Sequence, residues 1–357
     1  MDQVLPEVRS LPVTVRRESV PGLYFIPSVF LLQANVCMPW YESIRARTRE
    51  IAYVATLFVV AAVVVWYALD HRPFSTADAA ASDDAVTPLA CDVVARGKLP
   101  TLPEASSLAI SRRDPQVLWS LNDSGAPSIV ALNPSGDLLS RVRITGASVN
   151  DWEDITAAPC GNQSCLYIAD TGNGGGTQRN DVVVYRVREP LSTDKETAPA
   201  EVFDAAYPDG EDHESDAVFA LNGQLFLITK GHPALLFAFP HDLTAGTMQT
   251  LEKIGEIPTA GFPPGTIPRR YRVTDAEASP DGRWVAIRTN DALLVYRGAD
   301  LFAHRTSSFW RTDLRFLSEP RGEGVAISNE GDVFLASERV SEGAGTFAHL
   351  KCALDSR

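Results

Sequence analysis

The sequence predicts an all-β fold, a five-bladed β-propeller preceded by one N-terminal transmembrane helix. Three observations lead to this prediction. A short pattern occurs five times, the last copy lacks a strand that an unpaired segment near the first copy can supply, and one apolar segment precedes all the copies. A six-bladed ring fits the pattern less well, because only five copies are found.

The repeat is clearest in its last copy, residues 321–339. Glu323 precedes a short apolar strand, a Ser-Asn-Glu-Gly turn follows, and a second strand ends at Glu338 and Arg339. Earlier copies with the same order begin near Ser106, Glu153, Glu214 and Asp275, so the copies lie about 47 to 61 residues apart. Repeats of this length are typical of β-propellers, in which each copy forms one blade.

Each copy continues into further strands rich in β-branched and aromatic residues. Third strands are expected from positions 128, 182, 234, 292 and 346, and fourth strands from 138, 200, 249 and 308. The fifth copy has no room for a fourth strand. Residues 92–98 form a strand-like segment without a hairpin partner, so we expect them to complete the last blade and close the ring.

Residues 51–69 carry no formal charge and are long enough to cross a hydrocarbon core. Arg45, Arg47 and Arg49 precede them, which places the N-terminus in the cytoplasm. No cleavage site follows closely, which favours an uncleaved signal anchor. The expected order is a cytoplasmic segment (1–50), a single-pass anchor in the inner or plasma membrane (51–69), an acidic linker (70–90) and a propeller on the periplasmic or extracellular side (91–357). Met38 is a second candidate start besides Met1.

The cysteines are consistent with an oxidising exterior. Cys91 and Cys352 lie on strands expected to be neighbours in the last blade, and Cys160 and Cys165 flank a short turn. We therefore predict two disulfides. Cys37 lies alone before the apolar segment.

A first candidate site consists of carboxylates that precede the innermost strands. It contains Glu153, Glu214 and Glu323, with Asp275 near the equivalent place in the fourth copy. Inner strands surround the propeller axis, so these side chains should converge. Two carboxylates about 4 Å apart repel by about 4 kcal/mol at an effective dielectric constant near 20, so they need a proton, a cation or an arginine. Oxygen ligands alone favour Ca²⁺ over zinc. The alternative is that these carboxylates accept hydrogen bonds from backbone amides of neighbouring blades.

A second candidate site is a polar ring of mixed charge at the ends of the second strands. It would bind a small polar ligand, although solvated strand ends have the same composition. Its members are Asp123, Asp170, Lys230, Arg288, Glu338 and Arg339.

Several function classes are disfavoured. A net charge of −13 argues against nucleic acid as a partner, because phosphate binding needs a basic face. The chain contains no G-x-S-x-G, H-E-x-x-H or Walker A motif. His213, beside Glu214, is the one candidate general base near a repeat glutamate.

Four short motifs resemble the SdiA-regulated family of membrane-anchored propellers, which is distantly similar to NHL-repeat and esterase-like phytase propellers. They are S-S-L-A at Ser106, D-W-E-D-I at Asp151, H-E-S-D-A at His213 and E-G-V-A with G-D-V-F-L-A-S-E ending at Glu338. The resemblance covers roughly residues 92–355. It implies five blades, an N-terminal anchor and a bound calcium ion, with Glu153, Glu214 and Glu323 matching the family's repeat glutamates.

Two functions follow as hypotheses. The first is a non-catalytic, calcium-binding propeller held outside the membrane to bind a ligand or partner. The second is a metal-dependent hydrolase of a phosphoester or lactone that uses metal-activated water. We favour the first, because such hydrolases usually place His or Asn beside the metal and only His213 lies near a repeat glutamate.

Overall fold

The computed structural model describes residues 86–357, except 174–178, 232, 259–270, 341–342 and 355–357. Chain contacts separate Met1–Val64 from Val65–Arg357, and the described residues belong to the second unit. No helix in this described part is long and apolar enough to span a membrane. The predicted anchor (51–69) lies outside the described residues.

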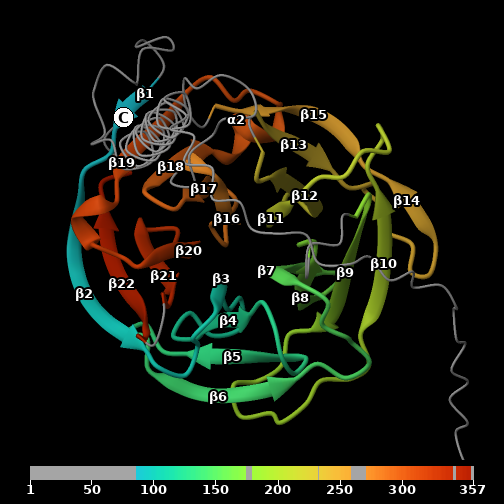
Figure 1. Cartoon of the computed structure of the whole chain (residues 1–357), viewed down its shortest axis with the longest axis horizontal. Helices are drawn as coiled ribbons and strands as arrows, with labels where there is room; N and C mark the ends of the chain where they lie inside the picture. The colour runs from blue at the N-terminus through green and yellow to red at the C-terminus, as the bar shows by residue number, and fades with distance from the viewer. Residues whose placement is uncertain (1–85, 174–178, 232, 259–270, 341–342, 355–357) are drawn as a thin grey trace, which may run out of the picture. The chain divides into compact units, whose positions relative to one another are not determined.

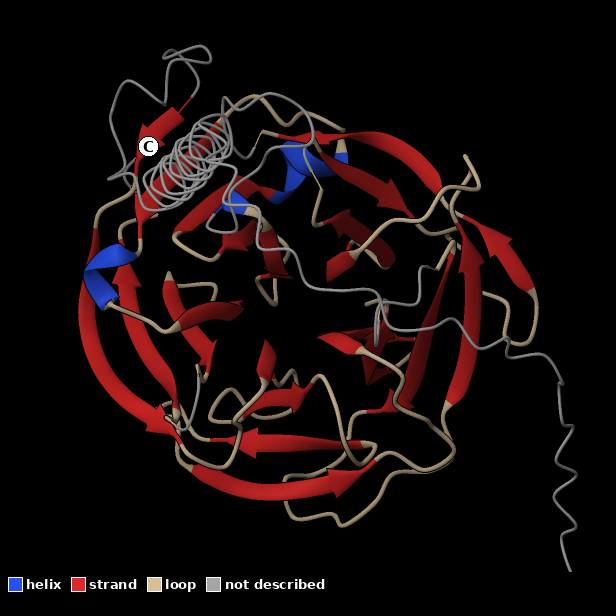
Figure 2. Ribbon diagram, in the orientation of Figure 1, coloured by secondary structure: helices blue, strands red, loops and turns tan. Residues whose placement is uncertain are grey.

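Five β-sheets surround a common axis and confirm the five-bladed propeller (Figures 1 and 2). The first blade consists of β3 (Ala105–Ile110), β4 (Leu118–Asn122), β5 (Ser128–Leu132) and β6 (Leu138–Arg143). The second consists of β7 (Trp152–Cys160), β8 (Gln163–Asp170), β9 (Asp181–Arg188) and β10 (Glu201–Ala206). The third consists of β11 (Ser215–Leu221), β12 (Gln224–Thr229), β13 (Ala234–Ala238) and β15 (Glu252–Ile257).

The fourth blade consists of β16 (Val273–Ala278), β17 (Trp284–Thr289), β18 (Ala292–Arg297) and β19 (Phe309–Asp313). The fifth consists of β20 (Arg321–Ile327), β21 (Asp332–Glu338), β22 (Gly345–Cys352) and β2 (Cys91–Leu99). Two short helices, α2 (Gly298–Phe302) and a 3₁₀ turn (Arg315–Leu317), lie in connections of the fourth blade.

The ring closes through β2, which pairs antiparallel with β22 as the outer strand of the fifth blade. Cys91 lies opposite Cys352 in this ladder, and the two form a disulfide. A second disulfide joins Cys160 and Cys165 across the β7–β8 turn. Segments at opposite ends of the domain sequence are therefore held together by backbone pairing and by a covalent bond.

Two further strands add to outer edges in parallel orientation. β1 (Val86–Pro88), in the segment expected to be linker, pairs with β19. β14 (Met248–Thr250) pairs with β10 of the second blade, whereas β15 pairs with β13 of the third. The single strand expected from position 249 is thus divided between two blades. Both additions cover backbone groups that an outer strand would otherwise leave unpaired.

The apolar core lies between adjacent blades rather than at the axis. Phe219 and Phe226 of the third blade share one cluster with Val285 and Ile287 of the fourth. The inner strands β3, β11 and β16 are buried along their whole length, so they lack the alternation of a half-exposed strand. This burial makes polar residues at their beginnings significant, because a buried polar group needs a partner.

Every inner strand begins with an irregularity in its pairing to the second strand. The extra residue at this β-bulge occupies an equivalent place in each blade. The bulged residues form an upper ring: Ser106, Glu153, Asp216, Thr274 and Glu323. The residues that follow them form a lower ring: Ser107, Asp154, Ala217, Asp275 and Gly324.

The closing disulfide is expected to stabilise the ring strongly. It joins residues 261 positions apart, so its removal by Cys91→Ser with Cys352→Ser should cost about 5 kcal/mol in the chain-entropy model. The matched control, Cys160→Ser with Cys165→Ser, opens a separation of 5 residues and should cost about 2 kcal/mol. Denaturant unfolding of the two double variants measures both values, and equal losses would contradict the expectation.

Candidate functional site

The upper ring surrounds a buried lysine. Lys230 directly follows β12 and is 8% exposed. Its ammonium forms an ion pair with Asp216 and lies 3.4 Å from Glu214 Oε1. Burial alone would lower the pKa of Lys230, but attraction to Asp216, Glu153 and Glu323 raises it above its usual value. Lys230 is therefore charged at neutral pH and compensates several carboxylates at once.

A second cation, Arg321, completes this group, which we call the axial cluster (Glu153, Asp216, Lys230, Arg321 and Glu323). Arg321 at the start of β20 forms ion pairs with Glu323 and Glu338. Burial raises the pKa of Glu323 to about 8, against the opposing effects of Lys230 and Arg321. Burial and the charge of Asp216 also raise the pKa of Glu153 well above its usual value. Even with two cations nearby, burial thus favours the protonated, neutral form of Glu323 and Glu153 at neutral pH.

The four residues predicted to bind metal occupy different places. Glu153 and Glu323 belong to the axial cluster. The side chain of Glu214 is 44% exposed and contacts Lys230 from one side. Asp275 lies one ring lower. Asp216 and Thr274, rather than Glu214 and Asp275, are the structural equivalents of Glu153 and Glu323.

A calcium ion does not fit at the centre of the axial cluster, because the Lys230 ammonium already faces the same carboxylates. Within the described residues, no group of three or more His, Cys, Asp or Glu side chains is arranged to hold a metal ion. The requirement for a cation, inferred from the sequence, is instead met in part by Lys230 and Arg321.

The lower ring connects the blades. The side chain of Asp154 accepts hydrogen bonds from Ser107 Oγ and from the backbone N–H of Val218 in the next blade. Asp275 accepts one from Val325 N–H in the fifth blade, and one from Leu108 N–H at 3.3 Å in the first. Asp275 thus makes the interblade contacts that were the alternative to metal binding. Burial raises the pKa of Asp154 to about 7 and that of Asp275 well above its usual value.

The six residues predicted to form a ligand-binding ring also lie in different environments. Asp170 is buried, accepts hydrogen bonds from Asn150 N–H and Asp151 N–H, and pairs with Arg179 at 2.7 Å. Arg339 is exposed, and its backbone N–H donates to Pro103 O.

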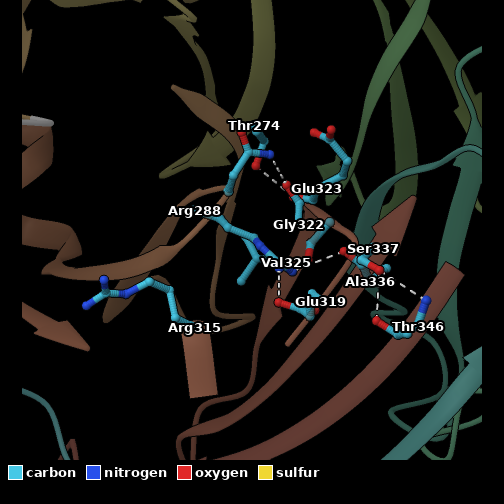
Figure 3. Close-up of polar contacts among 12 residues, drawn as sticks. Thr274, Arg288, Arg315, Glu319, Gly322, Glu323, Val325, Ala336, Ser337 and Thr346 are labelled. Atoms are coloured by element: carbon cyan, nitrogen blue, oxygen red, sulfur yellow. Dashed lines mark hydrogen bonds and ion pairs between the residues drawn. The ribbon is translucent and has the colours of Figure 1, made fainter. Parts of the chain in front are cut away.

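Arg288 is fully buried between the fourth and fifth blades. It donates to Gly324 O at 2.7 Å and to Ala336 O at 3.0 Å, and it pairs with Glu319 (Figure 3). In the other four blades the residue at the equivalent position of the second strand is apolar: Leu121, Ala169, Ile228 and Ala336. Arg288 therefore joins two blades and does not face a ligand in the structure.

Beside the axial cluster lies a group of carboxylates that we call the acidic rim (Glu104, Asp123, Asp151 and Glu338). Burial, Glu104 and Glu338 together raise the pKa of Asp123 to about 7. Burial and Asp216 raise the pKa of Asp151 to about 6, although Lys230 opposes this. These residues come from the first, second and fifth blades, where strands end or begin at the same end of the propeller.

Four buried polar atoms near the rim have no hydrogen-bond partner among the described residues. Arg321 Nε and Glu323 Oε1 form an ion pair with each other, whereas Asp216 Oδ1 and Asn173 Oδ1 are acceptors without a donor in this part of the chain. Asn173 follows Gly172, which lies against Asp151. Asp216 as a whole is 1% exposed. A buried acceptor without a donor is unfavourable, so both atoms favour a ligand that donates hydrogen bonds. Asp216, Asp154 and Arg321 are not among the site residues predicted from the sequence. Aligning the copies on the residue before each apolar run would have placed Asp216 with Glu153 and Glu323.

The described residues thus define a five-bladed β-propeller with an acidic, hydrogen-bond-accepting cluster at one end of its axis. No family model and no curated protein matches the sequence, and the resemblance to the SdiA-regulated family stays a prediction.

Similar solved structures include a PQQ-bound aldose sugar dehydrogenase from Streptomyces coelicolor, at 10% identity and TM-score 0.45, covering 75% of this chain and 100% of that one. A gluconolactonase from Xanthomonas campestris has 10% identity and TM-score 0.38, covering 74% and 97%. The calcium-binding protein regucalcin from Agrobacterium tumefaciens has 12% identity and TM-score 0.36, covering 75% and 96%. These similarities are too distant to transfer an activity.

Proposed function

We propose that this propeller is a non-catalytic binding module whose acidic rim takes an organic cation, a ligand with an ammonium or guanidinium group. The observation that carries the proposal is the surplus of hydrogen-bond acceptors over donors at this end of the axis, including Asp216 Oδ1 and Asn173 Oδ1, which have no partner in the part of the chain that the structure describes. An ammonium or guanidinium group supplies positive charge and several N–H donors together.

An extended organic cation suits the rim better than a single metal ion. The rim carboxylates come from three blades and are not gathered into a set of metal ligands. A polyatomic cation can reach several of them at once, whereas calcium needs six to eight oxygens at about 2.3–2.6 Å. Calcium, predicted from the sequence, remains the competing ligand in the experiment below.

The proposed setting is the periplasmic or extracellular side of a membrane, as in the resemblance to membrane-anchored propellers. Two disulfides support an oxidising compartment. The anchor itself rests on the sequence of residues 51–69.

The hydrolase alternative has less support at this site. The hydroxyl of Ser107 is fully buried and donates to Asp154 as part of the lower ring. The imidazole of His213 contacts Asp209 at 2.9 Å and packs edge-on against Tyr207. The hydrolase hypothesis needs a metal-bound water beside a histidine. The imidazole of His213 is already paired with Asp209, and the described residues contain no group of three or more His, Cys, Asp or Glu arranged to hold the metal.

Cation binding at the rim should release protons at pH 7. The pKa of Asp123 is about 7 in the absence of ligand, and a bound cation stabilises its charged form. Calorimetric titration with spermidine, arginine and calcium chloride, each in two buffers of different ionisation enthalpy, measures affinity and proton release together. We expect an organic cation to bind with proton release.

Asp123→Asn should weaken this binding at least tenfold and abolish most of the proton release. The matched control is Asp92→Asn, which removes one charge from an exposed residue of β2 and should change neither quantity. Binding of calcium alone, sensitive to Asp123→Asn, would overturn the organic-cation proposal in favour of the metal. Absence of binding by all three probes would also overturn it.

A further inference from the structure

A cavity lies at the opposite end of the inner strands from the axial cluster. The cluster gathers where the inner strands begin, whereas the cavity is bounded by the turns in which β3, β16 and β20 end. It has a volume of about 620 Å³, within the range of small-molecule sites in proteins. Residues of the first, fourth and fifth blades line it, so only the assembled ring creates it.

One wall of the cavity is aromatic. Phe334 of β21 and His349 of β22 lie opposite each other in the ladder, with ring centroids 4.5 Å apart and planes at 26°. Ile110, at the end of β3, adds apolar surface. Phe334 also stacks with Phe347 and is only 6% exposed, so the partly exposed imidazole of His349 supplies the flat surface that the apolar face of a ring-shaped ligand can cover.

Arg112 lines the same cavity and is a fixed hydrogen-bond donor. Arg112 Nε donates to Ala157 O, and Nη1 donates to Pro280 O, both at 2.8 Å. These carbonyls belong to the second and fourth blades, so the guanidinium is held between them. No further hydrogen bond or ion pair of Arg112 is found among the described residues, which leaves its remaining N–H groups for a ligand.

Two other polar side chains are also held in place. Asn329 Oδ1 accepts a hydrogen bond from Asp281 N–H at 3.0 Å, so the side-chain amide has a defined orientation. Asp332 accepts hydrogen bonds from Ser328 Oγ at 3.2 Å, His349 Nε2 at 2.9 Å and Lys351 Nζ at 3.0 Å. Preorganised groups of this kind lose little freedom on binding, which favours affinity.

We propose that this cavity binds a small, neutral, hydroxyl-rich ring, such as a mono- or disaccharide. Arg112, Glu330 and Asp332 all line the cavity, and Asp332 is paired with His349 and Lys351, so neither an anion nor a cation is favoured. The aromatic wall suits the C–H face of a sugar ring. The guanidinium, amide and carboxylate suit hydroxyl groups, each of which both donates and accepts. The proposal is independent of the organic-cation site, which lies at the other end of the inner strands.

Saturation-transfer NMR on the full chain with glucose, galactose, maltose and cellobiose tests the proposal. We expect transfer to at least one sugar, followed by a measurable affinity in calorimetric titration. Asn329→Asp keeps the acceptor for Asp281 N–H but removes the amide donor, and it should weaken sugar binding at least fivefold. His349→Ala removes the partly exposed ring of the aromatic wall and should have a similar effect.

Asp123→Asn, at the opposite end, is the control and should leave sugar binding unchanged. Spermidine binding, or an unchanged melting temperature, identifies folded protein in both cavity variants. Failure of all four sugars to show transfer would overturn the proposal. Sugar binding that neither variant weakens would also overturn it. So would sulfate binding that is stronger than the binding of every sugar and that is lost in Asn329→Asp.

Discussion

Replacing Arg288 by alanine is expected to destabilise the propeller by about 3–5 kcal/mol, because a buried ion pair loses one partner. The Arg288 side chain is 0% exposed and that of Glu319 is 6% exposed. Without the guanidinium, the Glu319 carboxylate stays buried and uncompensated, and the carbonyls of Gly324 and Ala336 lose a donor (Figure 3). The fourth and fifth blades would then be joined less firmly.

The matched control is Arg315→Ala, which removes an arginine from the neighbouring 3₁₀ turn. Arg315 pairs with Asp313 at the surface, and its side chain is 35% exposed, so the loss should be about 1 kcal/mol or less. Urea unfolding of both variants measures the difference. Adding Glu319→Gln to Arg288→Ala should recover part of the stability, because it removes the uncompensated charge. Similar losses in the two single variants would contradict the assigned role of Arg288.

The glycine beside this pair explains how the arginine is accommodated. A Cβ atom on Gly322 would lie 2.3 Å from Arg288 Nη2 and 2.5 Å from Asn290 O. The second contact is with backbone and cannot be relieved by rotating a side chain. Glycine at this position therefore allows the guanidinium to pass between the blades.

Replacing Lys230 by methionine is expected to cost about 3–5 kcal/mol at pH 8, because Asp216 stays buried without its cation. The loss should be smaller at pH 5. At low pH the carboxylates of the axial cluster are protonated and need no compensating charge, and the methionine stem retains most of the packing.

The pKa values determine how this loss of stability depends on pH. The pKa of Glu323 in the folded protein is about 8, well above its ordinary value, so the folded state binds protons more tightly than the unfolded state. This contribution to stability is present at low pH and is lost as pH rises from about 4 to about 8. Lys230 lowers the pKa of Glu323, Glu153 and Asp216. Its removal raises them further, so stability should fall more steeply with pH in Lys230→Met than in the wild type.

Urea unfolding at intervals from pH 5 to pH 8.5 provides the comparison. Lys253→Met is the matched control, since Lys253 is 45% exposed and pairs only with Glu256 in the ion pairs found among the described residues. Its stability curve should run parallel to that of the wild type. A Lys230→Met curve that also ran parallel would show that Lys230 does not compensate the axial carboxylates.

Much of the fold could be predicted from local patterns. Apolar strands between polar turns recur at blade-length spacing, and this periodicity needs no knowledge of distant contacts. The closing strand could be predicted by counting strands. The last blade lacked an outer strand and the segment before the first blade had no partner, and in a closed ring this segment can pair with the last blade. The pairing of Cys91 with Cys352 followed from the same step.

The candidate site depended on features that a linear pattern does not contain. A β-bulge at the start of each inner strand decides which residue points to the axis, and this offset placed Asp216 where Glu214 was expected and moved Asp275 to the lower ring. Lys230 was selected for a ligand, yet only the meeting of three blades shows that its partners are the carboxylates themselves.

The sequence alone determined the number of blades, the closing strand and the acidity near the axis, because these follow from periodicity and composition. Only the tertiary structure decided which charges meet. Arg288 was predicted to bind a ligand at a strand end, but the adjacent blade buries it against Glu319. The cavity beside Phe334 and His349 likewise exists only where turns from three blades meet. Both outcomes depend on packing between segments far apart in the chain, for which a repeat pattern carries no signal.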